Sequence, residues 1–404
     1  MLGNMYDRGY GKQPKEKVLV LAGSLGHGHL QAAHAIREAA RTWYPQEAEV
    51  HVVDYLEQVS PHLHTVGSYC FVQWLKMFPN MYGFLFEMTR RDHRFSQLIK
   101  NVPLTSLRPL IKLIREVQPT IIVSTFPAAS AAVSRLKERG AVQCGLVTVI
   151  TDHTDHSFWI HPHTDRYLVG SEEARAKLAG QGIPACRIEV SGIPVRPEFY
   201  GNYDKVALRR RYGLDPDRMT VLLMGGGCGL LDPDFFRAME EADWAADMQF
   251  IVICGRNERL QRHLEEWAAS SPLHIRVEGY VQPVHEYMAM SDLLITKPGG
   301  VTTTEAVVQR LPLLVYKPLP GQEQDNIRYL VRKGLACQAE DPEDLVSQLS
   351  SFASRPEALQ WMSVRAQAER QHTQARVLEA ILQVERHPIV PRKTARLRFR
   401  RNYV

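Results

Sequence analysis

Short runs of apolar and often β-branched residues recur along this chain of 404 residues, and helical patterns separate them. Clear examples are VLVLAG at 18–23 and TVLLMGG at 220–226. Because nearly every residue in such a run is apolar, we expect strands that are buried on both faces, as in parallel sheets covered by helices. The other candidate strands are 49–56, 120–127, 146–152, 166–171, 188–195, 249–255, 275–281, 293–299 and 311–318. The sequence therefore predicts α/β architecture.

The apolar pattern lapses near residues 196–205, RPEFYGNYDK, where Pro, Gly and Asn cluster. A helical segment follows, and 220–226 then begins a second series of strands. This order, in a chain long enough for two domains, predicts two Rossmann-like doubly wound domains that face a cleft. The expected parts are an N-terminal extension (1–16), a first domain (17–198), a second domain with C-terminal helices (199–385) and a basic tail (386–404).

Composition narrows the class of protein. The net charge of +5 is too small to indicate nucleic-acid binding, and the six cysteines have no zinc-ligand spacing. The N-terminus has no apolar signal region and no run reaches 18 apolar residues, so we expect a cytoplasmic protein without a spanning helix. The last 13 residues carry six Lys or Arg and no acid, which indicates either a solvated tail or contact with anionic lipid.

Each predicted domain opens with a strand that runs into a glycine-rich turn. These turns are LAGSLGHGHLQAAHAI, which contains Gly28, and LLMGGGCGLL, which contains Gly226. Glycine lets the backbone approach a ligand, and the N–H groups at the start of a helix favour anions. Doubly wound folds also use such turns for packing alone, so a single turn is weak support for a phosphate site.

A third glycine element, ITKPGGVTTTEAVVQ, is more specific. Gly299, Gly300 and the threonines at 302–304 would place amides and hydroxyls at a helix N-terminus, which suits a diphosphate. Glu305, one turn into the helix, would accept the hydroxyls of a ribose, as acidic residues do in dinucleotide-binding folds. The same residues are also typical of an ordinary helix N-cap with an acid in the first turn. A cap and a ligand site can occur together.

A Pro-Gly loop follows the next strand as LPGQEQDN. It gathers Gln322, Glu323, Asp325 and Asn326 on one short polar stretch at the carboxyl end of a strand, where α/β folds bind ligands. These side chains match the hydroxyls of a hexose. Residues 296–326 are therefore predicted to form a nucleotide-sugar site.

The chain resembles the GT-B glycosyltransferases of family 28, and most of all the monogalactosyldiacylglycerol synthases and processive diacylglycerol glucosyltransferases. The shared motifs occur in family order over residues 15–385: GHGHLQAA, VTVITD, FIVICGRN, VEGYV, TKPGG and LPGQEQDN. The resemblance implies an inverting hexosyltransferase that needs no cofactor or metal. Its donor would be UDP-glucose or UDP-galactose, and its acceptor a lipid such as diacylglycerol on the inner face of the cell membrane.

The resemblance also implies roles for residues of the second domain. Arg256 would contact the diphosphate and Glu305 the ribose. The uracil would lie beside Gly279, Tyr280 and Val281, the phosphates beside Gly299, Gly300, Thr302 and Thr303, and the hexose beside Gln322 and Glu323. Gly226 and Asn326 are also expected among the donor-binding residues.

The resemblance places a histidine near the acceptor hydroxyl at the position of His29. A helix N-terminus disfavours imidazolium, so a neutral His29 there could take a proton from an alcohol. His27 is the competing candidate, and both histidines could merely cap the turn. Asp152, at the end of a predicted strand, would orient the base or bind the acceptor.

Two further segments allow more than one interpretation. The stretch TDHTDHSFWIHPHTDR, at 151–166, has the residue types of a metal cluster, although an acceptor-side loop fits the resemblance better. Residues 63–90 are rich in aromatics and Met, and indicate either a core helix pair or a membrane contact. In the second case Trp74, Phe78 and Phe84 would enter the interface, with Arg90, Arg91 and Arg94 near headgroups.

The alternatives to a lipid glycosyltransferase are transfer to another acceptor (a peptidoglycan lipid or a soluble metabolite), a UDP-sugar epimerase and a non-catalytic UDP-sugar sensor. The Pro-Gly loop and the aromatic stretch argue against the epimerase.

Overall fold

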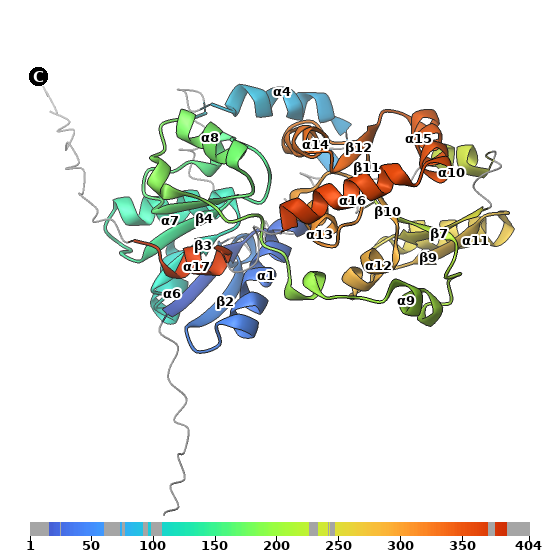
Figure 1. Cartoon of the computed structure of the whole chain (residues 1–404). Helices are drawn as coiled ribbons and strands as arrows, with labels where there is room; N and C mark the ends of the chain where they lie inside the picture. Colours follow the sequence, from blue (N-terminus) through green and yellow to red (C-terminus); the bar gives the residue numbers. More distant parts are fainter. Residues whose placement is uncertain are drawn as a thin grey trace, which may run out of the picture.

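The computed structural model describes residues 16–24, 26–59, 73–74, 77–91, 96–97, 107–225, 233–240, 242, 247–370 and 376–385. Within these ranges the strands form two six-stranded sheets, and every strand pair is parallel. The sheets lie in separate halves of the molecule, and α4 runs along one side across both halves (Figure 1). The predicted two-domain α/β fold is confirmed, while the exact domain boundaries remain predictions.

The first sheet has the order β2-β1-β3-β4-β5-β6. Its strands are β1 (Glu16–Ala22), β2 (Ala48–Asp54), β3 (Ile121–Ser124), β4 (Gly145–Val149), β5 (Arg166–Val169) and β6 (Ile188–Val190). The helices of this half are α1 (His27–Trp43), α2 (Tyr55–Val59), α4 (Pro79–Thr89), α6 (Arg108–Val117), α7 (Pro127–Glu138) and α8 (Glu172–Gly180). Every residue of β3 and β4 is buried, because α1 packs on one face of the sheet and α2, α6 and α7 pack on the other.

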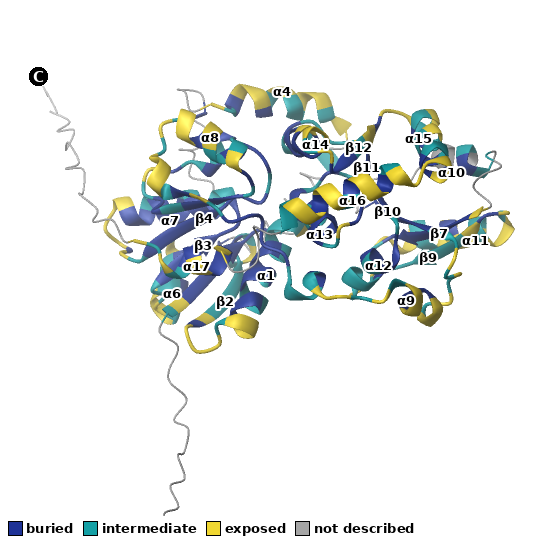
Figure 2. Ribbon diagram, viewed as in Figure 1, coloured by how far each residue is buried: buried dark blue, intermediate teal, exposed yellow. Residues whose placement is uncertain are grey.

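The second sheet has the order β12-β11-β10-β7-β8-β9. Its strands are β7 (Met219–Met224), β8 (Met248–Ile253), β9 (His274–Glu278), β10 (Leu293–Thr296), β11 (Leu313–Tyr316) and β12 (Ala336–Ala339). Its helices are α9 (Lys205–Arg211), α10 (Pro233–Glu240), α11 (Glu258–Ser270), α12 (Val284–Met290), α13 (Gly300–Val308), α14 (Gln322–Arg332), α15 (Pro342–Ser354) and α16 (Glu357–Arg370). They cover both faces, so the inner strands β7, β8, β10 and β11 are dark in the burial view, whereas the edge strand β9 is not (Figure 2).

The chain returns to the first half at its end. Helix α17 (Arg376–Leu382) buries Val377, Leu378 and Ile381 among residues of β1, β3 and α1. The predicted late helical region is thus two helices, α16 and α17, and the second of them packs on the first sheet.

Every predicted run overlaps a strand, but the sequence pattern missed β12. Its four residues, ACQA, include no β-branched or aromatic side chain and only half are buried, so they give no strand signal. Gly226, Arg94, the glycine turn after Gly225, the first fifteen residues and the basic tail lie outside the described residues.

Candidate active site

Two helix N-termini meet where the halves of the molecule join. Helix α1 begins at His27 and α13 begins at Gly300, directly after their glycine turns. A Cβ on Gly28 would lie 3.6 Å from the side chain of Val301, and Val301 is buried with Ala32 of α1. Both N-termini carry partial positive charge, so the junction favours an anionic ligand such as a diphosphate.

Gly300 lies directly against the end of β4. A Cβ at this position would clash with the carbonyl oxygen of Thr151 and would lie 3.0 Å from Asp152 Oδ1. Since backbone cannot move aside as a flexible side chain does, the junction requires glycine here. This close approach was not apparent from the sequence, which indicated only a phosphate-binding role for Gly300.

The predicted base, His29, lies in the first turn of α1 and is half-buried. Its Nδ1 is 3.0 Å from Thr151 Oγ1, and its ring contacts Phe126 and Trp159 edge-on, with centroids 5.4 and 5.9 Å away. Burial lowers the pKa of His29 below 6.5, although Asp152 and the backbone of Thr125 act in the opposite direction. His29 is thus neutral at pH 7, whereas His27 is exposed at the first position of the helix.

Thr151 connects His29 to Asp152. The hydroxyl of Thr151 lies 3.5 Å from Asp152 Oδ2, at the limit of a hydrogen bond, and the other carboxylate oxygen accepts a 2.8 Å hydrogen bond from Asn326 Nδ2. Thr151 was not among the residues predicted for the site. Its position directly before Asp152, just after β4, was the available signal, since α/β folds place ligands at the carboxyl ends of strands.

The Pro-Gly loop precedes α14 and presents the predicted sugar-binding residues. Gly321 has a φ of 98°, which favours glycine, and Gln322 begins the helix. Gln322 Oε1 accepts a 2.6 Å hydrogen bond from the hydroxyl of Tyr82, and Glu323 Oε2 accepts one of 2.6 Å from the backbone N–H of Leu319. Burial raises the pKa of Glu323.

Helix α4, from the aromatic stretch of the first half, covers this loop. A Cβ on Gly83 would meet Pro320, and a Cβ on Gly321 would lie 3.0–3.2 Å from the rings of Tyr82 and Phe86. These contacts explain why small residues occur at both positions.

Arg90 follows α4 and points inward. Its guanidinium pairs with Glu87, Asp155 and Asp325, at 2.8, 2.6 and 2.9 Å, and its side chain is 16% exposed. The structure therefore differs from the predicted location of Arg90 near lipid headgroups, because three carboxylates hold it between the two halves. Arg91 is exposed.

The other face of the aromatic stretch is apolar and open to solvent (Figure 2). Its exposed side chains are Met77, Phe78, Met81, Phe84 and Met88. Trp74 is half-buried and its ring lies 6.1 Å from that of Tyr82. The described part of the stretch thus combines a face packed on the loop with an exposed apolar face, where the sequence had offered core and membrane contact as alternatives.

The predicted nucleotide contacts gather at the ends of β8 and β9. The guanidinium carbon of Arg256 lies 5.1 Å from the centre of the Tyr280 ring, and the N–H of Gly255 donates to the carbonyl of Gly279 at 3.1 Å. Val281 is partly buried and packs against hydrophobic core residues of the second half. An exposed aromatic ring beside an arginine suits a base and a phosphate.

Within α13, Glu305 is buried and faces Arg196 and Glu198. Burial, aided by Glu198 and opposed by Arg196, raises the pKa of Glu305 to about 7. The Thr303 hydroxyl is also buried and donates to Gly299 O at 2.9 Å, whereas Thr302 is half-buried. Thr302 is therefore better placed than Thr303 to reach a phosphate.

The histidines of 151–166 pack against neighbouring elements. His153 stacks on Tyr329 of α14, His156 Nε2 lies 3.1 Å from Thr89 Oγ1, and His161 Nε2 lies 2.9 Å from Phe158 O. Across the residues that the structure describes, no group of three His, Cys, Asp or Glu is arranged to hold a metal ion. No helix among them is long and apolar enough to cross a membrane.

Comparison with known proteins identifies the family. The model of monogalactosyldiacylglycerol synthase matches residues 29–195, and that of the glycosyltransferase family 28 C-terminal domain matches residues 220–378. The chain is 30% identical to the processive diacylglycerol beta-glucosyltransferase of Staphylococcus haemolyticus, over 91% of this chain and 93% of that one. The chain belongs to the family of the processive diacylglycerol beta-glucosyltransferases. The predicted family and enzyme class, a glycosyltransferase, are confirmed.

Other relatives agree in length and fold. The same enzyme of Bacillus licheniformis is 28% identical over 86% of this chain and 89% of its own. Among solved structures, Anabaena HepE with UDP-glucose has a TM-score of 0.55 at 15% identity, covering 91% of this chain and 98% of that one. The UDP-GlcNAc 2-epimerase of Neisseria meningitidis has a TM-score of 0.54 at 14% identity, covering 86% and 94%. Since an epimerase also shares the fold, these structures show the GT-B-like architecture alone.

Proposed function

We propose that this glycosyltransferase moves a hexose from a UDP-hexose to the hydroxyl of a diacylglycerol-type lipid. The observation that carries the proposal is the meeting of two helix starts: Gly28, directly before His29 in α1, lies against Val301 in the first turn of α13. A base on one helix then faces an anion site on the other. Relatives named processive diacylglycerol beta-glucosyltransferase, similar over most of the chain, support the lipid acceptor and the hexose.

The second half of the molecule would hold the donor. Tyr280 and Arg256 would contact the uracil and the diphosphate, Glu305 the ribose, and Gln322 and Glu323 the hexose. The N–H groups at the start of α13 would stabilise the charge that develops on the departing UDP, so the transfer would require no bound cation.

The first half would supply the base. In the tautomer with its proton on Nδ1, His29 would donate to Thr151 Oγ1, and the Thr151 hydroxyl would point toward Asp152. Nε2 would then be the unprotonated ring nitrogen that can accept a proton. Nε2 takes the proton of the lipid hydroxyl while that oxygen attacks the anomeric carbon. The bond from this carbon to the UDP oxygen breaks on the opposite side, so the anomeric configuration inverts.

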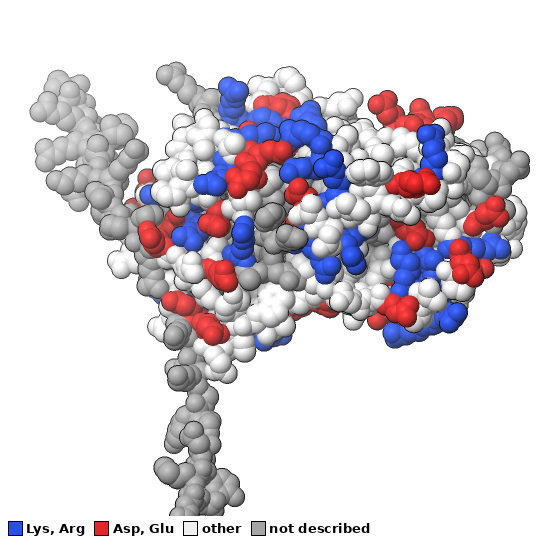
Figure 3. Space-filling view, in the orientation of Figure 1, with Lys and Arg blue, Asp and Glu red and all other residues white. Residues whose placement is uncertain are grey.

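The exposed face of α4 would meet the membrane beside this site. Phe78, Met81 and Phe84 are exposed there, and Lys and Arg side chains gather over the neighbouring α14 (Figure 3). Arg328 of α14, 70% exposed, is one of these basic groups. An apolar face bordered by cations suits peripheral binding to an anionic membrane surface, in a cell its inner face.

The purified protein should be incubated with vesicles containing diacylglycerol and either UDP-glucose or UDP-galactose, and the products analysed by mass spectrometry. We expect hexosyl-diacylglycerol and UDP, with UDP-glucose as the better donor. A changed UDP-sugar without lipid product would indicate an epimerase, and binding without any product would indicate a sensor.

A further inference from the structure

Asn326 is the most deeply enclosed polar residue of the predicted sugar-binding stretch. It lies in the second turn of α14 and its side chain has no exposed surface. The sequence indicated a contact with a sugar hydroxyl, as for its neighbours Gln322 and Glu323.

The carboxamide of Asn326 is fully engaged within the protein. Nδ2 donates to Asp152 Oδ1 and to the carbonyl of Pro298, both at 2.8 Å. Oδ1 accepts from the backbone N–H of His153 at 2.7 Å. A primary amide has two N–H donors, and both are used here, so none remains for a ligand.

These three bonds join parts of the predicted site that come from both halves. Pro298 lies directly before the glycines that open α13, and Asp152 and His153 follow β4. One side chain therefore bonds the turn before α13, the carboxylate of Asp152 near His29 and the backbone that follows it.

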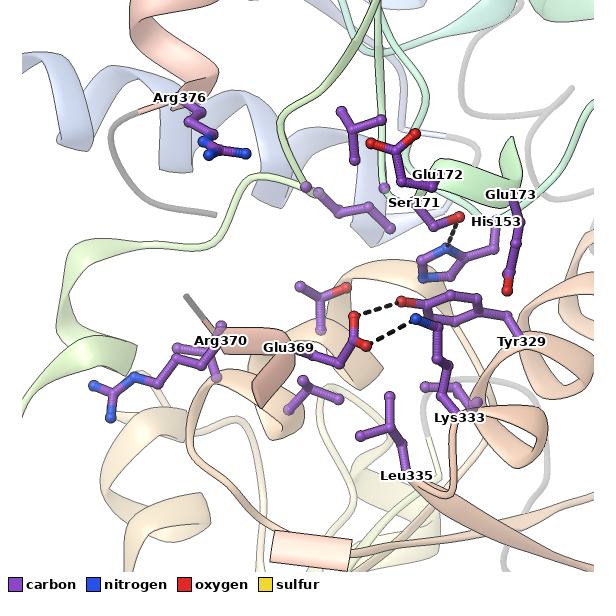
Figure 4. Close-up of a pocket in the computed structure, with 18 residues that line it drawn as sticks. His153, Ser171, Glu172, Glu173, Tyr329, Lys333, Leu335, Glu369, Arg370 and Arg376 are labelled. Atoms are coloured by element: carbon purple, nitrogen blue, oxygen red, sulfur yellow. Dashed lines mark hydrogen bonds and ion pairs between the residues drawn. The ribbon is translucent and has the colours of Figure 1, made fainter. Parts of the chain in front are cut away.

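The surroundings hold Asn326 in this position. The rings of His153 and Tyr329 stack with centroids 3.6 Å apart and an interplanar angle of 16°, so the two halves touch directly (Figure 4). The hydroxyl of Thr154 donates to Asp325 Oδ2 at 2.8 Å. Hydrogen bonds and ring stacking thus hold the first turns of α14 against residues 152–154.

We propose that Asn326 is a positioning residue. It orients Asp152, and through Thr151 the ring of His29, when the Pro-Gly loop and α14 are packed against residues 152–154. This inference rests on the proposed roles of His29 and Asp152. Asn326 fixes one carboxylate oxygen, so the other faces the Thr151 hydroxyl. A donor that holds α14 in this position would thereby also orient Asp152 and His29.

A double-mutant cycle of Asn326→Ala and Asp152→Asn tests the inference. Alone, Asn326→Ala should lower kcat by about 10- to 100-fold, because a misplacement of ~1 Å in a catalytic group can cost 100-fold. The KM for the UDP-hexose and the affinity for UDP should stay within about twofold. In a protein that already carries Asp152→Asn, adding Asn326→Ala should lower kcat only slightly further, because both changes act through the Asp152 carboxylate.

Three outcomes would overturn the inference. A raised KM for the UDP-hexose with unchanged kcat would indicate a sugar contact. Effects that multiply in the double mutant would show that Asn326 acts independently of Asp152. A loss of kcat that only follows unfolding, as circular dichroism would show, would indicate a purely structural role. Full activity of Asp152→Asn would instead overturn the proposed role of Asp152, which distinguishes the two failures.

Asn326→Asp is a second variant that keeps the shape of the side chain and the acceptor for His153. It places a carboxylate against Asp152 Oδ1 and the Pro298 carbonyl, so kcat should fall at least as far as in Asn326→Ala. Gln324→Asp is the matched control, because it adds the same charge to the same helix at a half-buried residue for which no side-chain bond is found among the described residues. A folded Asn326→Asp protein with the kcat of this control contradicts the inference.

Discussion

The hydroxyl of Tyr82 donates a 2.6 Å hydrogen bond to Oε1 of Gln322, across 240 positions of sequence. Tyr82 lies on α4, whose opposite face is exposed and apolar, and Gln322 opens the helix after the Pro-Gly loop. Burial raises the pKa of Tyr82 to about 12, so the phenol keeps its proton and remains a donor. The helix that would contact the lipid surface thus also fixes a side chain that would contact the sugar.

Replacing Tyr82 with Phe should therefore weaken donor recognition. A neutral hydrogen bond contributes about 0.5–1.5 kcal/mol, so we expect the KM for the UDP-hexose to rise by about 2- to 10-fold. UDP, which lacks the hexose, should bind as before in calorimetry. Tyr44→Phe is the control, since the Tyr44 hydroxyl bonds Glu379 at the far end of α1. Equal effects of both changes would contradict the account.

The pH dependence of kcat/KM should report His29. A base must be neutral, and burial lowers the pKa of His29, so activity should persist below pH 6.5 and fall only at more acidic pH. The negative charge of Asp152 raises that pKa. Asp152→Asn should therefore move the acidic limb to still lower pH, while the plateau rate falls. An acidic limb that moves to higher pH in Asp152→Asn would be incompatible with His29 as the base. A His29→Gln protein with the wild-type rate would be incompatible with it as well.

The junction at Gly300 should not tolerate a side chain. In Gly300→Ala the new methyl group would meet the Thr151 carbonyl, so the two halves would have to separate. We expect kcat to drop by about 100-fold or more, because the base and the donor site move apart. Gly180→Ala is the control, since a Cβ there has nothing within 4 Å. Wild-type kcat in Gly300→Ala would show that the halves do not act in this arrangement.

Glu305 should affect stability and nucleotide binding in opposite directions. Its pKa is raised from 4.5 to about 7, so the folded state loses stability as pH rises through this window. Glu305→Gln should then be more stable than the wild type at pH 8, by up to about 3 kcal/mol, and nearly equal at pH 4. Chemical denaturation at both pH values measures this.

The same variant should bind UDP at least about tenfold more weakly, since a hydrogen bond to a charged group contributes about 1.5–3 kcal/mol. Unchanged UDP affinity in calorimetry would exclude Glu305 from the ribose site.

Membrane binding should depend on the exposed face of α4. Phe84, 64% exposed, should contribute to vesicle binding, so Phe84→Ser should reduce flotation with anionic vesicles and leave UDP affinity unchanged. Trp361→Ser is the matched control, because Trp361 is 67% exposed on α16, in the other half. Equal loss in both variants, or no binding by the wild type, would contradict a membrane role for α4.

The strands other than β12 could be predicted because their buried apolar runs are a local property of the sequence. Buried runs such as LLVY at 313–316 carry their own signal, and so do the glycine turns before α1 and α13. The residue types of the site could likewise be found at the ends of strands, where α/β folds place ligands.

Contacts between the two halves could not be predicted in this way. Asn326 and Asp152 are 174 positions apart, and nothing in either local stretch encodes their hydrogen bond. Arg90 illustrates the same limit, because a basic residue after an aromatic stretch suggested a headgroup contact, whereas Asp325 binds it from 235 positions away. These pairings depend on how the two halves pack, which periodicity does not report.

The most direct measurement is the rate at which hexosyl-diacylglycerol appears from UDP-glucose and diacylglycerol vesicles, compared between the wild type and His29→Gln at matched UDP occupancy. We expect a lipid product from the wild type and a rate about 10²- to 10⁴-fold lower from the variant, with UDP affinity retained. Equal rates from both proteins would contradict the role of His29 as the base, and consumption of UDP-glucose that yields no glycolipid and does not depend on diacylglycerol would contradict the proposed transfer to lipid.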